Sequence, residues 1–192
     1  SKKEYEEKYH ILRKKDKNVC ITLRKEDLGD IGELSDDKKE RIVIAINNLV
    51  IKLLENDYSI TFVIQTKKDK EFTYNIYNQF KTNSEIMIIE EYDPLILREI
   101  YRNATCLFGM RLHSMILAMS VDTPVVGYFD LNWGSKNPGT LGRYGMPYGY
   151  INDEFDLYSL LQKALNNRDK MISEIEESKK ETLKLLGKEV LR

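Results

Sequence analysis

Five short apolar runs, separated by segments with helical spacing, constrain the fold of this chain most. The runs lie at residues 18–24, 59–65, 85–89, 105–108 and 124–129. Each is apolar at consecutive rather than alternate positions, which is typical of strands buried on both faces of a parallel sheet. Strands that alternate with helices build such sheets, with helices covering both sides. The sequence therefore predicts a doubly wound, Rossmann-like α/β domain.

Helical segments fill the gaps between these runs and follow the last of them. The clearest spans residues 36–55, where Ser35 is a typical N-cap and apolar residues recur at helical spacing. Asp93 and Pro94 form a typical helix start for residues 93–103. We also expect helices at residues 70–81, 113–120, 154–166 and 168–186, a linker helix within residues 1–17, and a glycine-rich loop over residues 132–145. Residues 18–192 then form one domain that ends in charged helices.

Length and charge narrow the classes of function. The chain has 192 residues, enough for one large domain with its own core. Its 30 Lys and Arg residues nearly balance 31 Asp and Glu residues, which argues against a surface devoted to nucleic acid or anionic lipid. No apolar run is long enough to span a bilayer, and the first residues are charged rather than a signal peptide. We expect a cytoplasmic protein without nucleic-acid partners, whose association with a membrane would be peripheral.

Several residues that bind metals in other proteins have structural explanations here. Cys20 and Cys106 lie inside two apolar runs without metal-ligand spacing, so we expect buried thiols rather than ligands or a disulfide. The paired carboxylates at residues 36–37, 90–91 and 153–154 each lie at a predicted helix start, where capping explains them. We therefore expect no metal site and no cofactor.

The segment ATCLFGMRLHSMILA, residues 104–118, has the strongest signature of a functional site. Its apolar run ends at Gly109, and Arg111 and His113 follow where a helix begins. A strand that passes into a helix through a glycine presents backbone N–H groups to an open crevice. Arginine binds carboxylates and phosphates, and histidine moves protons near neutral pH. Because Arg111 and the helix N-terminus both disfavour the imidazolium, we expect a neutral His113 that acts on a phosphorylated acid.

The expected strand order brings a second arginine to the same place. In the order 3-2-1-4-5, the first and fourth strands are neighbours at the topological switch point. Arg24 ends the first strand, so we expect it beside Arg111. The loop after the fifth run adds Trp133, Lys136 and Arg143 to the rim of the crevice.

These residues resemble those of the polysaccharide pyruvyl transferases. The resemblance rests on ITLR at residues 21–24, the Asp-Pro helix start, GMRLHSMILA at residues 109–118 and YFD at residues 128–130, and it runs over most of residues 18–150. Its sharpest piece is MRLH, residues 110–113. The family has a two-domain architecture like that of glycosyltransferase-B enzymes. The resemblance implies that this chain is the C-terminal half and that an N-terminal domain is its partner.

The resemblance also implies an activity and the residues that carry it. The activity is transfer of a pyruvyl group from phosphoenolpyruvate to two hydroxyls of a glycan or lipid-linked oligosaccharide, which places a cyclic ketal on a bacterial cell-surface exopolysaccharide. The Arg and His of the family motif fall on Arg111 and His113, which would hold and polarise the donor, and the strand-end arginine falls on Arg24. Gly109 and Leu112, in the same segment, are further expected binding residues. His113 would be an acid toward the donor or a base toward the hydroxyl. The family lysine is displaced here to Lys136. From its place on the predicted rim, Arg143 is expected to be a further binding residue.

Two other functions are compatible with the same residues. A glycosyltransferase of similar architecture would bind a sugar nucleotide in the crevice, with Glu91 or Asp130 on the ribose hydroxyls. A non-catalytic binding module of an exopolysaccharide assembly system would use the fold without chemistry. The Lys- and Glu-rich helices at both ends suit contact with another domain or plain solvation.

Overall fold

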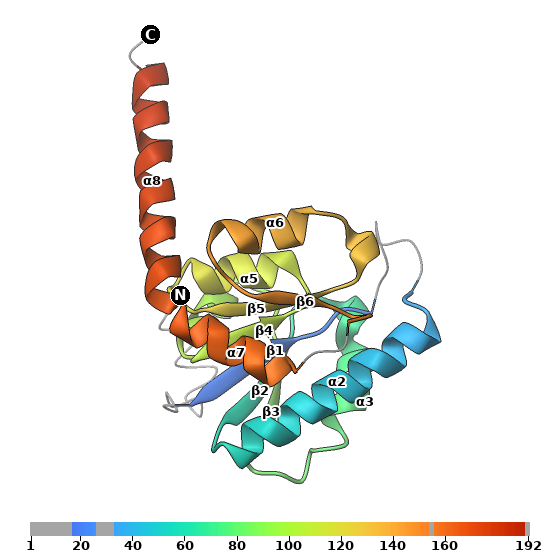
Figure 1. The fold of residues 1–192 in the computed structure, drawn as a ribbon. Helices are drawn as coiled ribbons and strands as arrows, with labels where there is room; N and C mark the ends of the chain where they lie inside the picture. Colours follow the sequence, from blue (N-terminus) through green and yellow to red (C-terminus); the bar gives the residue numbers. More distant parts are fainter. Residues whose placement is uncertain (1–16, 26–32, 154–155, 191–192) are drawn as a thin grey trace.

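The core of the molecule is a parallel sheet of six strands in the order β3-β2-β1-β4-β5-β6 (Figure 1). The computed structural model describes residues 17–25, 33–153 and 156–190. The strands are Asn18–Thr22 (β1), Ser59–Ile64 (β2), Ile86–Glu90 (β3), Cys106–Gly109 (β4), Val125–Phe129 (β5) and Tyr148–Tyr150 (β6). The doubly wound, Rossmann-like fold is confirmed, and so is the order of its first five strands. The sixth strand was not expected.

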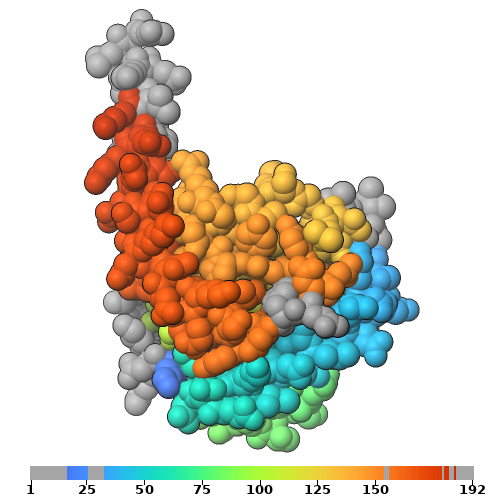
Figure 2. Space-filling model, viewed as in Figure 1, coloured from blue at the N-terminus to red at the C-terminus, as the bar shows by residue number. Residues whose placement is uncertain are grey.

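Helices cover both faces of this sheet. They are Asp36–Glu55 (α2), Lys70–Tyr77 (α3), Pro94–Arg102 (α4), Leu112–Met119 (α5), Lys136–Arg143 (α6), Leu157–Asn166 (α7) and Arg168–Val190 (α8), with short 3-10 helices at Lys67–Asp69 (η2) and Leu131–Trp133 (η3). Helices α2 and α7 pack together on one face, and α5 and α6 lie on the other (Figure 1). Helix α8 extends away from the body (Figure 2). In the part of the chain that the structure describes, no helix is both long and apolar enough to cross a membrane.

Local capping sets several helix ends as the sequence predicts. The Ser35 hydroxyl accepts the N–H of Lys38 at the start of α2, and the Asp93 carboxylate caps α4. Helix α7 begins at Leu157, three residues later than predicted, because Asp156 caps it. Helix α3 ends at Tyr77 rather than at residue 81, since the chain continues in turns. The helix predicted within residues 1–17 lies outside the described residues, apart from Lys17.

The glycine-rich loop predicted over residues 132–145 is wrong. This segment forms η3 and α6 and then leads into β6. Gly134 and Gly145 have φ of 76° and 68°, so they are turn residues on either side of α6. Pro138 lies in the first turn of that helix, where its missing N–H breaks no hydrogen bond. The glycines therefore mark the ends of a helix rather than a long loop.

The two cysteines are buried free thiols, as the sequence predicts. Burial raises the pKa of Cys20 to about 12, and it raises the pKa of Cys106 further. The thiolate is the reactive form, so at pH 8 ionisation alone slows alkylation of Cys20 by about 10³-fold relative to an exposed thiol. We expect iodoacetamide to leave both thiols unmodified in the folded protein and to modify both in guanidinium chloride, as counted by mass spectrometry. Rapid labelling of the folded protein would contradict their burial.

Candidate functional site

Two arginines emerge at the same point on the carboxyl edge of the sheet. Strands β1 and β4 are neighbours, and Thr22 pairs with Gly109 in their register. The N–H of Met110 donates to the Thr22 carbonyl at 3.0 Å, which extends this pairing by one residue. Arg24 and Arg111 each follow two residues after the paired positions. The predicted juxtaposition of the two strand ends is therefore present.

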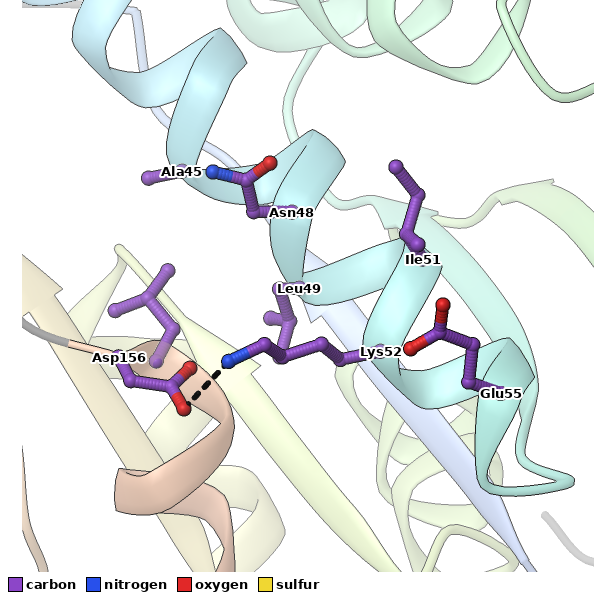
Figure 3. A pocket seen from close by; sticks show the side chains of 8 residues that line it. Ala45, Asn48, Leu49, Ile51, Lys52, Glu55 and Asp156 are labelled. Atoms are coloured by element: carbon purple, nitrogen blue, oxygen red, sulfur yellow. Dashed lines mark hydrogen bonds and ion pairs between the residues drawn. The ribbon is translucent and has the colours of Figure 1, made fainter.

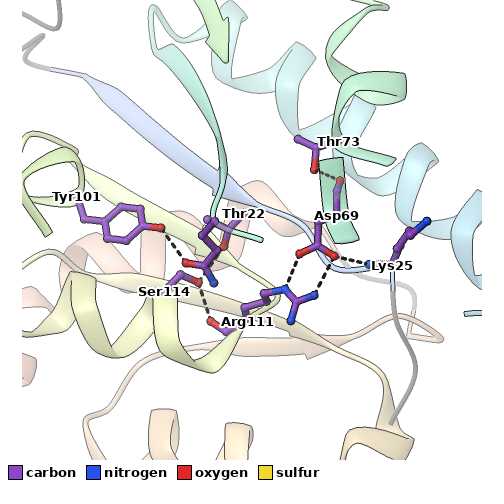
Figure 4. A network of polar contacts seen from close by, with 8 residues as sticks. Thr22, Lys25, Asp69, Thr73, Tyr101, Arg111 and Ser114 are labelled. Carbon is purple, nitrogen blue, oxygen red and sulfur yellow. Dashed lines mark hydrogen bonds and ion pairs between the residues drawn. The ribbon is translucent and has the colours of Figure 1, made fainter. Parts of the chain in front are cut away.

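The turn between β4 and α5 is held by close packing and by two hydrogen bonds, one of which reaches β1. A Cβ on Gly109 would lie 2.8 Å from Cγ of Met115, so close packing requires a glycine here. The buried Ser114 hydroxyl lies 2.6 Å from the Arg111 carbonyl, to which it donates, and 3.0 Å from the Thr22 hydroxyl (Figure 4). This arrangement gives Gly109 a structural function; its contact with a ligand stays a prediction.

Asp69 holds the Arg111 side chain. The Asp69 side chain is 2% exposed and accepts hydrogen bonds from Nε and Nη2 of Arg111, the second at 2.9 Å (Figure 4). The backbone N–H of Lys25 donates to the same carboxylate at 3.2 Å. Segments that follow β1, β2 and β4 thus meet at one carboxylate. Asp69 is not among the residues that the sequence predicts for the site, because an aspartate among lysines just before a helix is typical of an exposed cap.

The charge of Lys25 is turned toward an exposed carboxylate. Lys25 Nζ lies 2.8 Å from Glu33, and Lys39 Nζ lies 2.7 Å from the other oxygen of that carboxylate. These two lysines, Lys25 first, lower the pKa of Glu33 to about 2, and the hydrogen bond to Glu33 raises the pKa of Lys25. Lys25 is therefore cationic at neutral pH, but its charge is paired with Glu33. Its backbone N–H, and not its charge, contacts the carboxylate that holds Arg111.

Arg24 reaches across the end of β4. Its guanidinium lies 4.5 Å from the centre of the Trp133 ring, in η3 after β5. Because β4 lies between β1 and β5, this contact spans the strand that leads to Arg111. A second contact also joins the segment after β1 to the segment after β5. Lys38 of α2 forms a 2.6 Å ion pair with the buried Asp130. Asp130 also caps η3 by accepting the N–H of Asn132, so the helix that carries Trp133 is well anchored.

Three further predicted residues lie at this edge. His113 is the second residue of α5 and is exposed, and Leu112 before it is half-buried. The N-terminus of α5, whose first N–H groups have no partner within the helix, lies at the carboxyl end of β4. Lys136 is exposed at the first residue of α6, which begins on the same edge because it follows β5 and η3.

Arg143 is not on this rim. Strands β5 and β6 are parallel, so α6 must return from the carboxyl edge to the amino edge of the sheet. Arg143 ends that helix, roughly 10 Å from Lys136 along its axis. Its guanidinium donates to the Ser178 hydroxyl of α8 at 3.1 Å. The predicted rim position is wrong because the expected loop is a helix.

The two carboxylates that could bind a ribose are both engaged within the protein. Glu91 is buried, and its Oε1 accepts the N–H groups of Tyr92 and Asp93 at 2.8 and 3.0 Å. Asp130 is paired with Lys38, as described above. Within the described ranges, no three His, Cys, Asp or Glu side chains are grouped as metal ligands would be.

A separate groove of about 500 Å³ lies between α2 and α7 (Figure 3). Ala45, Leu49 and Ile51 supply apolar atoms to it, and the Lys52–Asp156 ion pair at 2.7 Å crosses it. None of the predicted site residues lines this groove, so it is distinct from the cluster of residues at the carboxyl ends of β1 and β4.

Sequence comparison supports one family. Residues 5–128 match the family model described as polysaccharide pyruvyl transferase. The matched range contains Arg24, Asp69, Arg111 and His113 and ends before Lys136. No curated protein matches the chain significantly.

Solved structures share the fold at low sequence identity. UDP-GlcNAc 2-epimerase from Methanocaldococcus jannaschii, in complex with UDP-GlcNAc and UDP, is similar with a TM-score of 0.58 and 20% identity, over 78% of this chain and 38% of that one. The Neisseria meningitidis epimerase bound to UDP-GlcNAc gives 0.58 and 15%, over 89% and 42%. The C-terminal CMP-Kdo binding domain of WaaA from Acinetobacter baumannii gives 0.55 and 9%, over 91% and 94%. The chain thus spans about two fifths of the epimerases it matches.

Proposed function

Because the chain belongs to the polysaccharide pyruvyl transferase family, we propose that it carries the donor site of an enzyme that transfers a pyruvyl group from phosphoenolpyruvate. The observation that supports this most is the emergence of Arg24 and Arg111 from paired positions of β1 and β4. Both are always charged, and both are held by neighbours, Arg24 by Trp133 and Arg111 by Asp69. Such a site favours a small ligand with more than one negative charge.

Phosphoenolpyruvate fits this arrangement because its carboxylate and its phosphate are both attached to one carbon, C2. Guanidinium groups bind either anion through two parallel hydrogen bonds. The N–H groups at the start of α5 add partial positive charge at the same edge. Lys136, at the start of α6, would extend the site on the side of β5. No cofactor is required for this chemistry.

The reaction forms two C–O bonds and breaks one. A proton adds to the methylene carbon C3, which becomes the methyl group, and the oxygen of one sugar hydroxyl bonds to C2. The bond from C2 to the phosphate oxygen then breaks, inorganic phosphate leaves, and the oxygen of the second hydroxyl bonds to C2 to close the ketal. The two hydroxyl protons balance the proton gained by C3 and the proton taken up by phosphate.

The chain's residues would divide this work by charge and exposure. Arg24 and Arg111 stabilise the charge that develops on the departing phosphate. His113 is exposed two residues after Arg111, so it can exchange protons as the acid toward C3 or as the base toward the hydroxyl. The acceptor is a glycan or lipid-linked oligosaccharide, which a second domain of the enzyme helps to bind. We place the reaction in the cytoplasm, with peripheral contact to the membrane where the acceptor is lipid-linked.

Donor binding tests this function directly. We expect isothermal titration calorimetry to show saturable binding of phosphoenolpyruvate and no binding of UDP-GlcNAc or of a CMP-sugar. Intrinsic fluorescence gives a second readout, since Trp133 is the single tryptophan and lies against Arg24. Binding of a nucleotide sugar without phosphoenolpyruvate would identify a glycosyltransferase, and binding of neither ligand would identify a non-catalytic module.

A further inference from the structure

We propose that Asp69 is a positioning residue of the donor site, a role that rests on the proposed function. Its carboxylate fixes the plane of the Arg111 guanidinium and the backbone after Arg24 at the same time. It does so through Arg111 Nε and Nη2 and through the N–H of Lys25 (Figure 4). The two arginines thereby keep a fixed relative position, although they come from different strands.

The backbone of Asp69 is itself held by a hydrogen bond from α3. Asp69 is the last residue of η2 and precedes α3, and the Thr73 hydroxyl donates to its backbone carbonyl at 2.8 Å. Both Asp69 and Thr73 are buried, with exposures of 2% and 0%. A buried side chain in a closed network has few alternative rotamers, which suits it to orient a second side chain.

The alternative is that the Asp69 carboxylate binds Arg111 only in the absence of a donor and releases the guanidinium when the donor binds. Release of Arg111 would leave a buried carboxylate with the Lys25 N–H and without its cation. An uncompensated buried charge is strongly unfavourable. The pair therefore persists when the donor binds, and Arg111 presents the donor with a guanidinium of fixed orientation.

If Asp69 positions Arg111, neutralising Asp69 changes the affinity for the donor in the opposite direction to the one that electrostatic attraction alone predicts. Removal of a negative charge near an anion site would strengthen anion binding if only electrostatic potential mattered. If Asp69 positions Arg111, the same change weakens binding, because the guanidinium loses its fixed orientation. The sign of the change in affinity thus separates the two effects.

The test compares three single substitutions by calorimetric titration with phosphoenolpyruvate, each well below its unfolding midpoint. We expect Asp69→Asn to weaken binding about tenfold although it removes a negative charge. Asp69→Glu keeps the charge but shifts its oxygens by one methylene, and we expect it to weaken binding as well, so it decides the question if Asp69→Asn does not fold. Thr123→Val is the matched control, since it removes a buried hydroxyl that donates to the Tyr101 carbonyl at 2.8 Å, remote from the arginines. It should lower the unfolding midpoint and leave the affinity unchanged.

The outcomes separate this inference from the proposed function. If the unsubstituted protein binds phosphoenolpyruvate and the Asp69 variants bind it equally or more tightly, Asp69 is not a positioning residue and the donor site stands. An equal loss of affinity in Thr123→Val would also overturn the inference, because the effect would then be one of general stability. If the unsubstituted protein does not bind phosphoenolpyruvate, the proposed function fails.

Discussion

Arg111→Gln is expected to lower kcat/KM for phosphoenolpyruvate by about 10²–10³-fold, the usual cost of removing one group that stabilises developing charge. Glutamine keeps a polar side chain but loses the cation and its two-pronged geometry. Lysine should not rescue the activity, because an ammonium is a point charge that cannot bind Asp69 and a planar anion in the same way. Phosphate release from the full enzyme with a glycan acceptor is the measurement.

Stability must be separated from activity in this experiment. Arg111 is the cation of the nearly buried Asp69, and breaking such a pair typically costs about 3–5 kcal/mol of unfolding free energy. The double variant Arg111→Gln with Asp69→Asn removes both charges, so it should regain much of that stability and none of the activity. Lys52→Gln, in an exposed ion pair with Asp156 across the groove, should change neither. Activity that returns with stability in the double variant would show that Arg111 matters for folding alone.

The sheet could be predicted because its signal is local and strong. Five apolar runs, separated by helices with recognisable starts at Ser35 and Asp93, leave few alternatives to a doubly wound sheet. The proximity of Arg24 and Arg111 follows from strand order alone, and the Thr22–Gly109 register agrees with it. Topology in this fold is thus enough to bring two distant cations to one edge.

What could not be predicted depends on side-chain packing and on short helices. Asp69 and Arg111 are far apart in sequence, and nothing in the segment around Asp69 distinguishes a buried anion from an exposed helix cap. The glycines of residues 132–145 predict one long loop, but Gly134 and Gly145 lie on either side of helix α6. The loop prediction therefore omits the sixth strand and places Arg143 at the wrong edge of the sheet. Turn residues show where the chain bends and carry little information on what lies between two bends.

His113→Gln is expected to separate chemistry from binding. His113 is exposed and is the second residue of α5, so its replacement should leave the fold and the affinity for phosphoenolpyruvate almost unchanged. Loss of a general acid or base typically lowers turnover by about 10²-fold or more, so kcat should fall while KM for the donor stays nearly constant. Arg111→Gln should raise KM for the donor as well as lower kcat, and this difference in KM distinguishes the two variants.

A matched control for His113 lies on the same helix. Ile116 is 43% exposed, so Ile116→Gln alters the surface of α5 without removing a titratable group, and we expect wild-type kcat from it. Added imidazole should partly restore turnover in His113→Gln and not in Arg111→Gln, because a small base can supply a proton relay but not a fixed cation. If His113→Gln keeps full turnover, the proton on C3 comes from solvent or from the acceptor domain, and catalysis by this chain reduces to charge stabilisation by its two arginines.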